Sequence, residues 1–143
     1  MRYLLVDAHS AIFSWPEFHG LHRRNGLAAR EELTRRLTAY QDASGVRVVV
    51  VFDGKGVRSN SETVPGGVQV FYSGGGKTAD CIIERLAAKY AGEHEITVAT
   101  NDNLVQQTVI TFGGLAISVE ALRTLMDEGE RDVSRQIRRL KNR

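Results

Sequence analysis

The sequence predicts a single α/β domain with a parallel sheet covered by helices on both faces. Five short apolar runs alternate with segments of helical periodicity, an order typical of parallel sheets. The second and fourth runs are rich in β-branched residues and lack a polar and apolar alternation, as expected for strands buried on both faces. With 143 residues, 42% of them hydrophobic, the chain can build one sizeable core.

The five runs define the expected strands. They are YLLVD (3–7), VRVVVVFD (46–53), GVQVFYS (67–73), EITVAT (95–100) and LAIS (115–118). The longest irregular stretch, 54–66, lies between the second and third strands, and we expect it to be the most mobile part of the chain.

Four helices are expected from apolar spacing. They lie around residues 33–40, at 79–90, at 102–111 and from about 119 onwards, with Gly129 as a break or kink in the last. The second is the clearest, because its apolar residues follow the i, i+3, i+4, i+7 and i+11 positions of one helix face.

The C-terminal segment is strongly basic. Residues 131–143 contain six Arg or Lys and one Asp, a local charge of +5, although the whole chain carries only +2. Val133, Ile137 and Leu140 share one stripe, so we expect this helix to dock on the body and to present its arginines to an anionic partner, above all nucleic acid. A merely solvated helix face is the alternative. The expected organisation is a domain over 1–128 and a continuous basic helix or tail over 129–143.

The composition also bears on the compartment. Cys81 is the only cysteine, so no intrachain disulfide can form. The apolar run at 4–6 is too short for a signal-peptide core, and VVVVF (48–52) is far shorter than the roughly 20 residues that span a bilayer. We therefore expect a soluble, cytoplasmic protein with no membrane partner.

The stretch YSGGGKTADCIIERL (72–86) contains a Gly-Lys-Thr that resembles part of a phosphate-binding loop. Such a loop needs Gly-x-x-x-x-Gly-Lys-Ser/Thr, and here Phe71 stands where its first glycine belongs. Phe cannot readily adopt the positive φ of that position. Thr78 is instead a good N-cap for the helix that follows. A nucleotide-binding or phosphatase function is correspondingly disfavoured.

Acidic residues fall at the ends of the predicted strands. Asp7 closes the first strand, Asp53 closes the second, and Asp102 follows the fourth by two residues. The working crevice of an open α/β sheet lies at these carboxyl ends. Asp80, in the first turn of its helix, joins them if that helix start faces the crevice, with Glu84 one turn further along.

Such a group of carboxylates predicts a site for a hard cation. Carboxylates repel one another unless a cation lies between them, and Mg²⁺ or Mn²⁺ prefers oxygen ligands. A metal held in this way can generate hydroxide and stabilise the charge that develops during phosphodiester cleavage. Taken singly, each aspartate has a structural interpretation as a turn residue or as an acid at a helix N-terminus.

Four segments together resemble the NYN type of PIN-like nucleases, and most of all the YacP-like family of bacterial ribosome-associated endoribonucleases. They are LLVDAHSAIFSWP (4–16), VVVVFDGKG (48–56), KTADCIIERLA (77–87) and VATNDNLVQQ (98–107). The resemblance extends over nearly the whole chain, and the spacing between the segments agrees. It implies a PIN-like, Rossmann-like three-layer sandwich with strand order 3-2-1-4-5 and an NYN/PIN-like domain over 1–128.

The resemblance also implies the roles of the acidic residues. Asp7 and Asp80 match the family's central metal-binding acids, Asp102 and Asp53 complete the pocket, and Thr100 orients neighbouring groups. The expected protein is a Mg²⁺- or Mn²⁺-dependent endoribonuclease that cuts mRNA, in some members on the ribosome.

The sequence departs from the family pattern beside two of these acids. Ala8-His9-Ser10 replaces the usual Gly-Tyr-Asn, so Ser10 would support the metal site only through water, and Cys81 replaces a second acid after Asp80. These changes keep a second hypothesis open, namely an RNA- or ribosome-binding module with weak or no cleavage.

Several side chains are candidates for RNA contacts, because phosphate contacts provide most of the affinity for RNA. The candidates are His9, Lys55, Arg58, Lys77, Arg135, Arg138 and Arg139. Phe13 and Trp15 are aromatic and follow the first acid; we expect Phe13 to lie in the core rather than to stack on bases.

Overall fold

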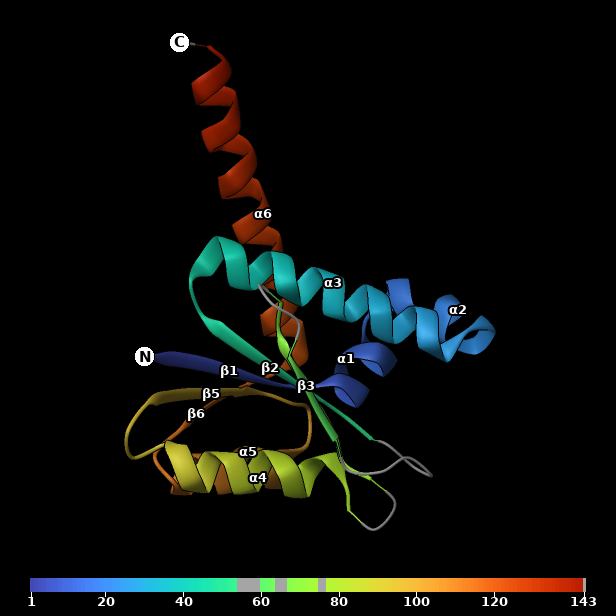
Figure 1. Ribbon diagram of the computed structural model, residues 1–143, viewed down its shortest axis with the longest axis vertical. Helices are drawn as coiled ribbons and strands as arrows, with labels where there is room; N and C mark the ends of the chain where they lie inside the picture. Colours follow the sequence, from blue (N-terminus) through green and yellow to red (C-terminus); the bar gives the residue numbers. More distant parts are fainter. Residues whose placement is uncertain (54–59, 64–66, 75–76, 143) are drawn as a thin grey trace.

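The chain folds around one six-stranded sheet flanked by two helical layers (Figure 1). The computed structural model describes residues 1–53, 60–63, 67–74 and 77–142. The elements in chain order are β1 (Arg2–Asp7), α1 (Ala8–Ser14), α2 (Pro16–Arg24), α3 (Gly26–Ser44), β2 (Arg47–Phe52), β3 (Asn60–Thr63), β4 (Gln69–Tyr72), α4 (Ala79–Tyr90), β5 (Glu95–Ala99), α5 (Asn103–Thr111), β6 (Leu115–Ile117) and α6 (Val119–Lys141).

The sheet has the order β3-β4-β2-β1-β5-β6. Its five parallel strands, β4-β2-β1-β5-β6, confirm the predicted order 3-2-1-4-5. β1 lies in the centre, and its Leu5 is opposite Val49 of β2 and Val98 of β5. All three residues are buried, which explains the unbroken apolar runs in the sequence.

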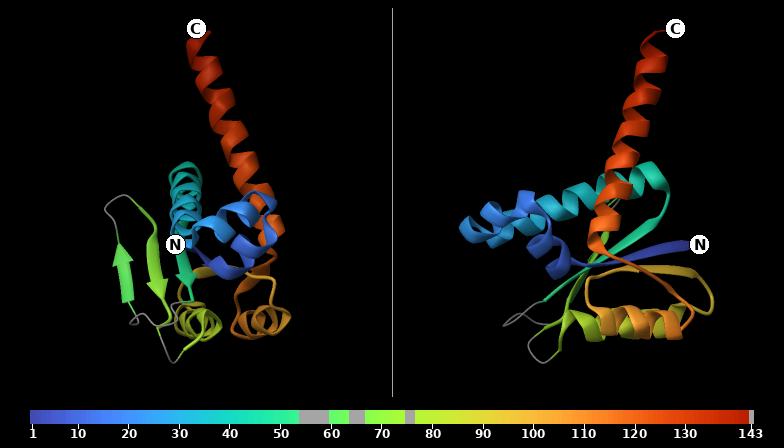
Figure 2. Two further views of the ribbon diagram at one scale, coloured as in Figure 1. Left: turned by 90° about the vertical axis from the view of Figure 1, so that its right-hand side faces the viewer. Right: turned by 180° about the vertical axis from the view of Figure 1, so that it is seen from behind.

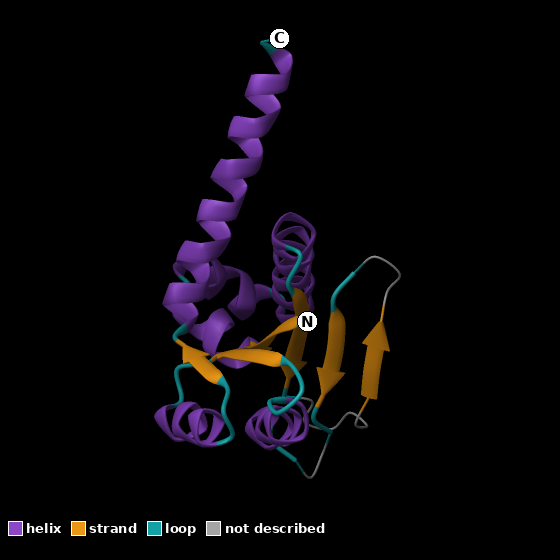
Figure 3. Ribbon diagram, turned by 90° about the vertical axis from the view of Figure 1, so that its left-hand side faces the viewer, coloured by secondary structure: helices purple, strands orange, loops and turns teal. Residues whose placement is uncertain are grey.

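Two separate clusters of buried side chains hold the layers together. On one face, Trp15, Leu33, Leu37 and Leu122 from the α1, α3 and α6 side pack against the sheet. On the other face, α4 and α5 pack through residues such as Ile83. Figure 3 shows α4 and α5 end-on on one side of the sheet, with α3 and α6 on the other. The result is the expected three-layer sandwich.

Capping residues mark where α3 and α4 begin. The Thr78 hydroxyl accepts a hydrogen bond from the Cys81 N–H, as expected for the N-cap of α4. The Asn25 side chain caps α3 in the same way, and that helix ends at Gly45, whose φ of +74° is readily adopted by glycine.

The predicted loop 54–66 contains a strand that we did not expect. β3 pairs antiparallel with the edge strand β4, and its sequence, NSET, has no apolar residue to signal a strand. We also expected this stretch to be mobile. The rest of it, residues 54–59 and 64–66, lies outside the described residues.

Two further corrections concern the segment after β1: its secondary structure and the burial of its aromatic residues. α1 and α2 occupy residues 8–24, for which no helix was predicted. Phe13 is not a core residue, because its side chain is 52% exposed, whereas Trp15 is fully buried and donates a hydrogen bond of 2.9 Å from Nε1 to the Val119 carbonyl. α1 buries the face that carries Ala8, Ala11 and Ile12, and Phe13 lies off that face.

The last helix also differs from expectation. α6 runs without a break through Gly129. The stripe Val133, Ile137 and Leu140 does not dock, since these side chains are 40%, 48% and 68% exposed. The C-terminal half of α6 extends beyond the other elements, so it has no described surface to cover (Figure 2). Among the described residues, no helix is long and apolar enough to cross a membrane.

Candidate active site

The strand order changes direction next to β1, and the acidic side chains gather there. β1 pairs in parallel with β2 on one side and with β5 on the other. The carboxyl ends of these three strands carry Asp7, Asp53 and the segment Thr100–Asp102. This is the switch point at which open α/β sheets bind ligands.

Asp7 is held rigidly at the end of β1. Its side chain is 4% exposed, and its Oδ2 accepts hydrogen bonds from Ser10 Oγ (2.7 Å) and Thr100 Oγ1 (2.9 Å). Both hydroxyls come to the same oxygen. Ser10, which we expected to support the site only through water, therefore contacts the Asp7 carboxylate directly. Thr100 likewise contacts this carboxylate, and its orienting role in a metal site stays a prediction.

The neighbouring Asn101 was not predicted as a site residue. Its backbone N–H donates to Ser10 Oγ (3.2 Å), and its Nδ2 donates to Ser14 Oγ (3.1 Å) and Glu120 Oε1 (3.0 Å). Its Oδ1 accepts from the Val119 N–H (3.0 Å). Asn101 thus fastens the end of β5 to α1 and α6. In the sequence, only its position between Thr100 and Asp102 indicated that Asn101 lies near the acidic group.

Asp102 has a structural role as well as its position in the acidic group. Its Oδ1 caps α5 by accepting from the N–H groups of Leu104 (2.9 Å) and Val105 (3.2 Å). Its own N–H donates to Thr100 Oγ1 (3.2 Å). Asp102 is therefore a helix cap, and its role as a metal ligand stays a prediction.

Asp53 connects the end of β2 to the beginning of α4. Its Oδ1 accepts from the Ala79 N–H (3.0 Å) and from Ser73 Oγ (3.3 Å). Because Ala79 is the first residue of α4, this contact fixes where the helix begins. It thereby sets the place of Asp80.

Asp80 is close enough to the other aspartates for their charges to change its titration. The pKa of Asp80 is raised from 3.8 to about 6, first by burial and then by nearby negative charge. The charged neighbours are Asp7, Asp102 and Asp53, and Asp102 also shares a hydrogen bond with Asp80. Three aspartates at the carboxyl ends of β1, β2 and β5 therefore act on Asp80 at the start of α4. Within the described residues, Glu84 makes no hydrogen bond or ion pair.

The carboxylate oxygens of the four aspartates are the type of ligand that a hard divalent cation such as Mg²⁺ prefers. Among the described residues, however, no three His, Cys, Asp or Glu side chains lie close enough together to form a ready metal site. Mg²⁺ typically keeps several waters and binds only one or two carboxylates directly, so a complete protein cage is not required. Burial and then the repulsion of the nearby carboxylates raise the pKa of Asp80, and a bound cation would relieve that repulsion.

The predicted RNA-contacting residues are spread over the molecule. His9 is exposed beside Asp7, and Lys77 is exposed just before α4. Lys55 and Arg58 lie outside the described residues. Arg135, Arg138 and Arg139 are exposed on the part of α6 that extends away from the body (Figure 2), and Arg135 pairs with Asp132 at 3.6 Å.

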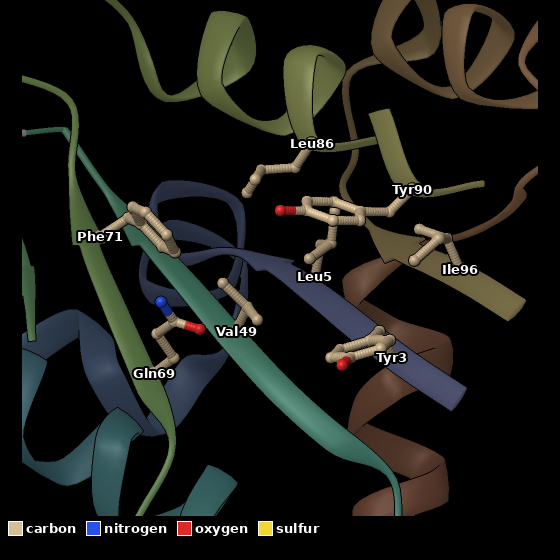
Figure 4. Close-up of a pocket in the computed structure, with 8 residues that line it drawn as sticks. All are labelled: Tyr3, Leu5, Val49, Gln69, Phe71, Leu86, Tyr90 and Ile96. Atoms are coloured by element: carbon tan, nitrogen blue, oxygen red, sulfur yellow. The ribbon is translucent and has the colours of Figure 1, made fainter. Parts of the chain in front are cut away.

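A separate apolar pocket of about 190 Å³ lies between the sheet and the C-terminal half of α4 (Figure 4). Its lining includes Tyr3, Phe71, Leu86 and Tyr90. None of the predicted site residues belongs to it, so we do not assign the chemistry to this pocket.

Comparison with known proteins gives consistent results. The family model described as "YacP-like NYN domain" matches residues 4–143. The chain is 32% identical over 142 residues to "Uncharacterized protein YacP" of Bacillus subtilis (strain 168), covering 98% of this chain and 84% of the relative. Two crystal structures of Rae1 (YacP) from Bacillus subtilis superpose on 99% of the chain. The W164L mutant has a TM-score of 0.83 at 31% identity and 84% coverage of its own chain; the other has 0.81, 32% and 83%.

Proposed function

Because the chain belongs to the family of YacP-like NYN domains, we propose that it is a metal-dependent endoribonuclease. NYN domains are generally nucleases, and an RNA-related, nuclease-like function follows from membership. The more specific proposal is hydrolysis of phosphodiester bonds in mRNA with Mg²⁺ or Mn²⁺, with the ribosome as a partner.

The observation that supports the proposal most directly is that Asp80 is partly buried at the switch point and lies close enough to Asp7, Asp102 and Asp53 for their negative charge to raise its pKa further. Asp7, Asp80 and Asp102 would hold the metal, and Asp53 would support the pocket. Like-charged carboxylates that lie close together are costly, and such groups concentrate where an enzyme needs them.

In the proposed reaction, different residues of this chain orient the metal ligands and contact the RNA. The hydroxyls of Ser10 and Thr100 keep Asp7 in one orientation, and the bond from the Ala79 N–H to Asp53 holds the start of α4, which carries Asp80. A bound Mg²⁺ or Mn²⁺ would supply Lewis acidity and neutralise charge during hydrolysis. Lys77 and His9, exposed at the rim, would contact the RNA backbone on either side.

The basic part of α6 fits a contact with the phosphates of RNA. Arg135, Arg138 and Arg139 are exposed and extend from the body, which suits a long anionic partner such as ribosomal RNA. We propose that residues 129–143 serve this purpose and that 1–128 form the nuclease domain.

Cleavage of a labelled mRNA in a bacterial translation extract with Mg²⁺ tests the activity. Three proteins are compared: wild type, Asp7→Asn, and Asp42→Asn, which removes the same charge from an exposed position on α3. We expect cleavage by wild type and Asp42→Asn only. Equal cleavage by all three would exclude Asp7 from the site.

A second function is favoured by one observation, the replacement of the family's Gly-Tyr-Asn after the first acid by Ala8-His9-Ser10. It is binding of RNA or the ribosome without cleavage. In that case wild type and Asp7→Asn would both leave the mRNA whole and would sediment with ribosomes equally well.

A further inference from the structure

A small pocket opens beside the acidic group, on the side of the sheet that carries α1 and α3. It has a volume of about 150 Å³, and its lining includes His9, Phe13, Gly26, Arg30 and Asp53. Asp53 belongs both to this pocket and to the acidic group, so the two are contiguous. An RNA strand whose phosphate lies at the aspartates would therefore pass over the pocket.

The pocket has an aromatic wall at the surface. Phe13 is 52% exposed, and its ring lies against that of His9, with the centroids 4.3 Å apart and the planes 32° from parallel. The carbonyl of Phe13 is within 3.0 Å of His19 Nε2, which further fixes this part of α1. Proteins bind unpaired RNA bases by stacking them on aromatic side chains held in this manner.

Polar groups and size also fit a base. The Arg30 side chain is partly buried and makes no hydrogen bond or ion pair within the described residues, so its guanidinium can donate to a ligand. The Asp53 carboxylate adds an acceptor on the side of the acidic group. A cavity of roughly 150 Å³ holds a benzene ring, which is close to the size of a pyrimidine.

We propose that this pocket binds one nucleobase of single-stranded RNA, next to the phosphate that is cut. The base stacks on Phe13 and receives a hydrogen bond from Arg30. This rests on the proposed function, since it assigns a base-binding subsite to the same acidic site. Bases inside a double helix are stacked on one another and cannot enter, so the pocket selects for unpaired RNA.

The test measures the affinity of the full chain for a fluorescent single-stranded RNA by anisotropy, in EDTA so that the RNA stays intact. The variants are Phe13→Ala, Phe13→Trp, Arg30→Met and a control, Phe112→Ala, which removes a ring that is 44% exposed at the end of α5. A second set of RNAs carries one abasic nucleotide, placed at each position in turn.

We expect Phe13→Ala to weaken binding roughly 5- to 140-fold, the usual effect of losing one stacked base. Phe13→Trp should bind like wild type, Arg30→Met should bind more weakly, and Phe112→Ala should be unchanged. For wild type, an abasic nucleotide at one position of the RNA should weaken binding. For Phe13→Ala, the same abasic nucleotide should cause no further loss of affinity.

Two results would overturn the proposal: Phe13→Ala binding as tightly as Phe112→Ala, or an abasic effect of equal size in wild type and Phe13→Ala. Failure of the nuclease function has a different signature. In that case wild type would still show the Phe13-dependent abasic effect in EDTA but would cut no RNA when Mg²⁺ or Mn²⁺ is added.

Discussion

The hydroxyl of Thr100, at the end of β5, donates a hydrogen bond of 2.9 Å to the buried carboxylate of Asp7, at the end of the adjacent β1. The same hydroxyl accepts from the Asp102 N–H (3.2 Å), so a single side chain connects two of the proposed metal ligands. Hydrogen bonds to a charged group contribute more to stability than neutral ones.

Thr100→Val keeps the shape of the side chain and removes this connection. We expect the free energy of unfolding to fall by about 1–3 kcal/mol, because a buried carboxylate loses a donor and the Asp102 N–H loses its acceptor. Urea unfolding measures the change. Thr108→Val, which removes an exposed hydroxyl bond to the Leu104 carbonyl, should cost less than about 0.5 kcal/mol. Equal losses in the two variants would mean that Thr100 has no special role.

Asp80 predicts a particular pH dependence of stability in the absence of metal. Its pKa is raised to about 6 in the folded protein, above its ordinary 3.8, so the folded state holds a proton that the unfolded state has lost. This contribution is fully present below the unfolded pKa and is lost as the pH rises through the folded pKa. Wild type should therefore lose stability, relative to Asp80→Asn, between about pH 4 and pH 6.5.

Thermal unfolding in EDTA across this pH range measures the difference. Asp80→Asn should melt at a higher temperature than wild type at pH 7.5, and the gap should shrink towards pH 4. A gap that is the same at both pH values would contradict the raised pKa of Asp80 in the folded protein.

Much of the fold could be predicted from the sequence, because a buried parallel strand leaves a distinctive apolar run. The strands 46–53 and 95–100 were expected within a residue of the observed β2 and β5. β3 could not be found in this way, since the sequence NSET contains no apolar residue that would mark an edge strand. α1 and α2 were missed for a related reason: each is short, and Asp7, the N-cap of α1, makes no side-chain cap bond.

The spacing of apolar residues reveals which face of a helix is apolar but does not identify its partner. Leu122 and Met126 of α6 are buried, and Val133 and Ile137 continue the same pattern, yet the second pair is exposed because the body ends before it. The same argument applies to Phe13. Its position off the stripe of Ala11 and Ile12 was visible in the sequence, but only once a helix over 8–14 was known.

The acidic group was predictable as a set of strand-end residues, whereas its connections were not. Asp7, Asp53 and Asp102 follow strands in the sequence, which is sufficient to bring them to one edge of a parallel sheet. The hydrogen bonds of Asn101 and of Asp53 depend on backbone positions in other elements, so no local pattern encodes them.

Divalent metal should stabilise the folded protein through the same aspartates. Adding Mg²⁺ or Mn²⁺ at pH 7.5 should raise the melting temperature of wild type, since a ligand present at 100 times its dissociation constant adds about 2.7 kcal/mol. Asp7→Asn should respond far less, whereas Asp42→Asn should respond like wild type. If Asp7→Asn and wild type shift equally, the metal binds elsewhere.

The arginines of α6 should affect RNA affinity without affecting the fold. Arg135, Arg138 and Arg139 are exposed and lie on the part of the helix that extends from the body, so replacing all three with Gln should leave the melting temperature nearly unchanged. If each contacts a phosphate of single-stranded RNA, the plot of log affinity against log salt should flatten by roughly 2, at about 0.7 per contact. Anisotropy at several salt concentrations measures this slope.

The matched control replaces Arg23, Arg24 and Arg47, three arginines outside α6 that also lie at exposed positions, and should keep the wild-type slope. An unchanged slope in the α6 variant would leave the basic segment as a solvated helix face and would place the RNA-binding charge on the body of the protein.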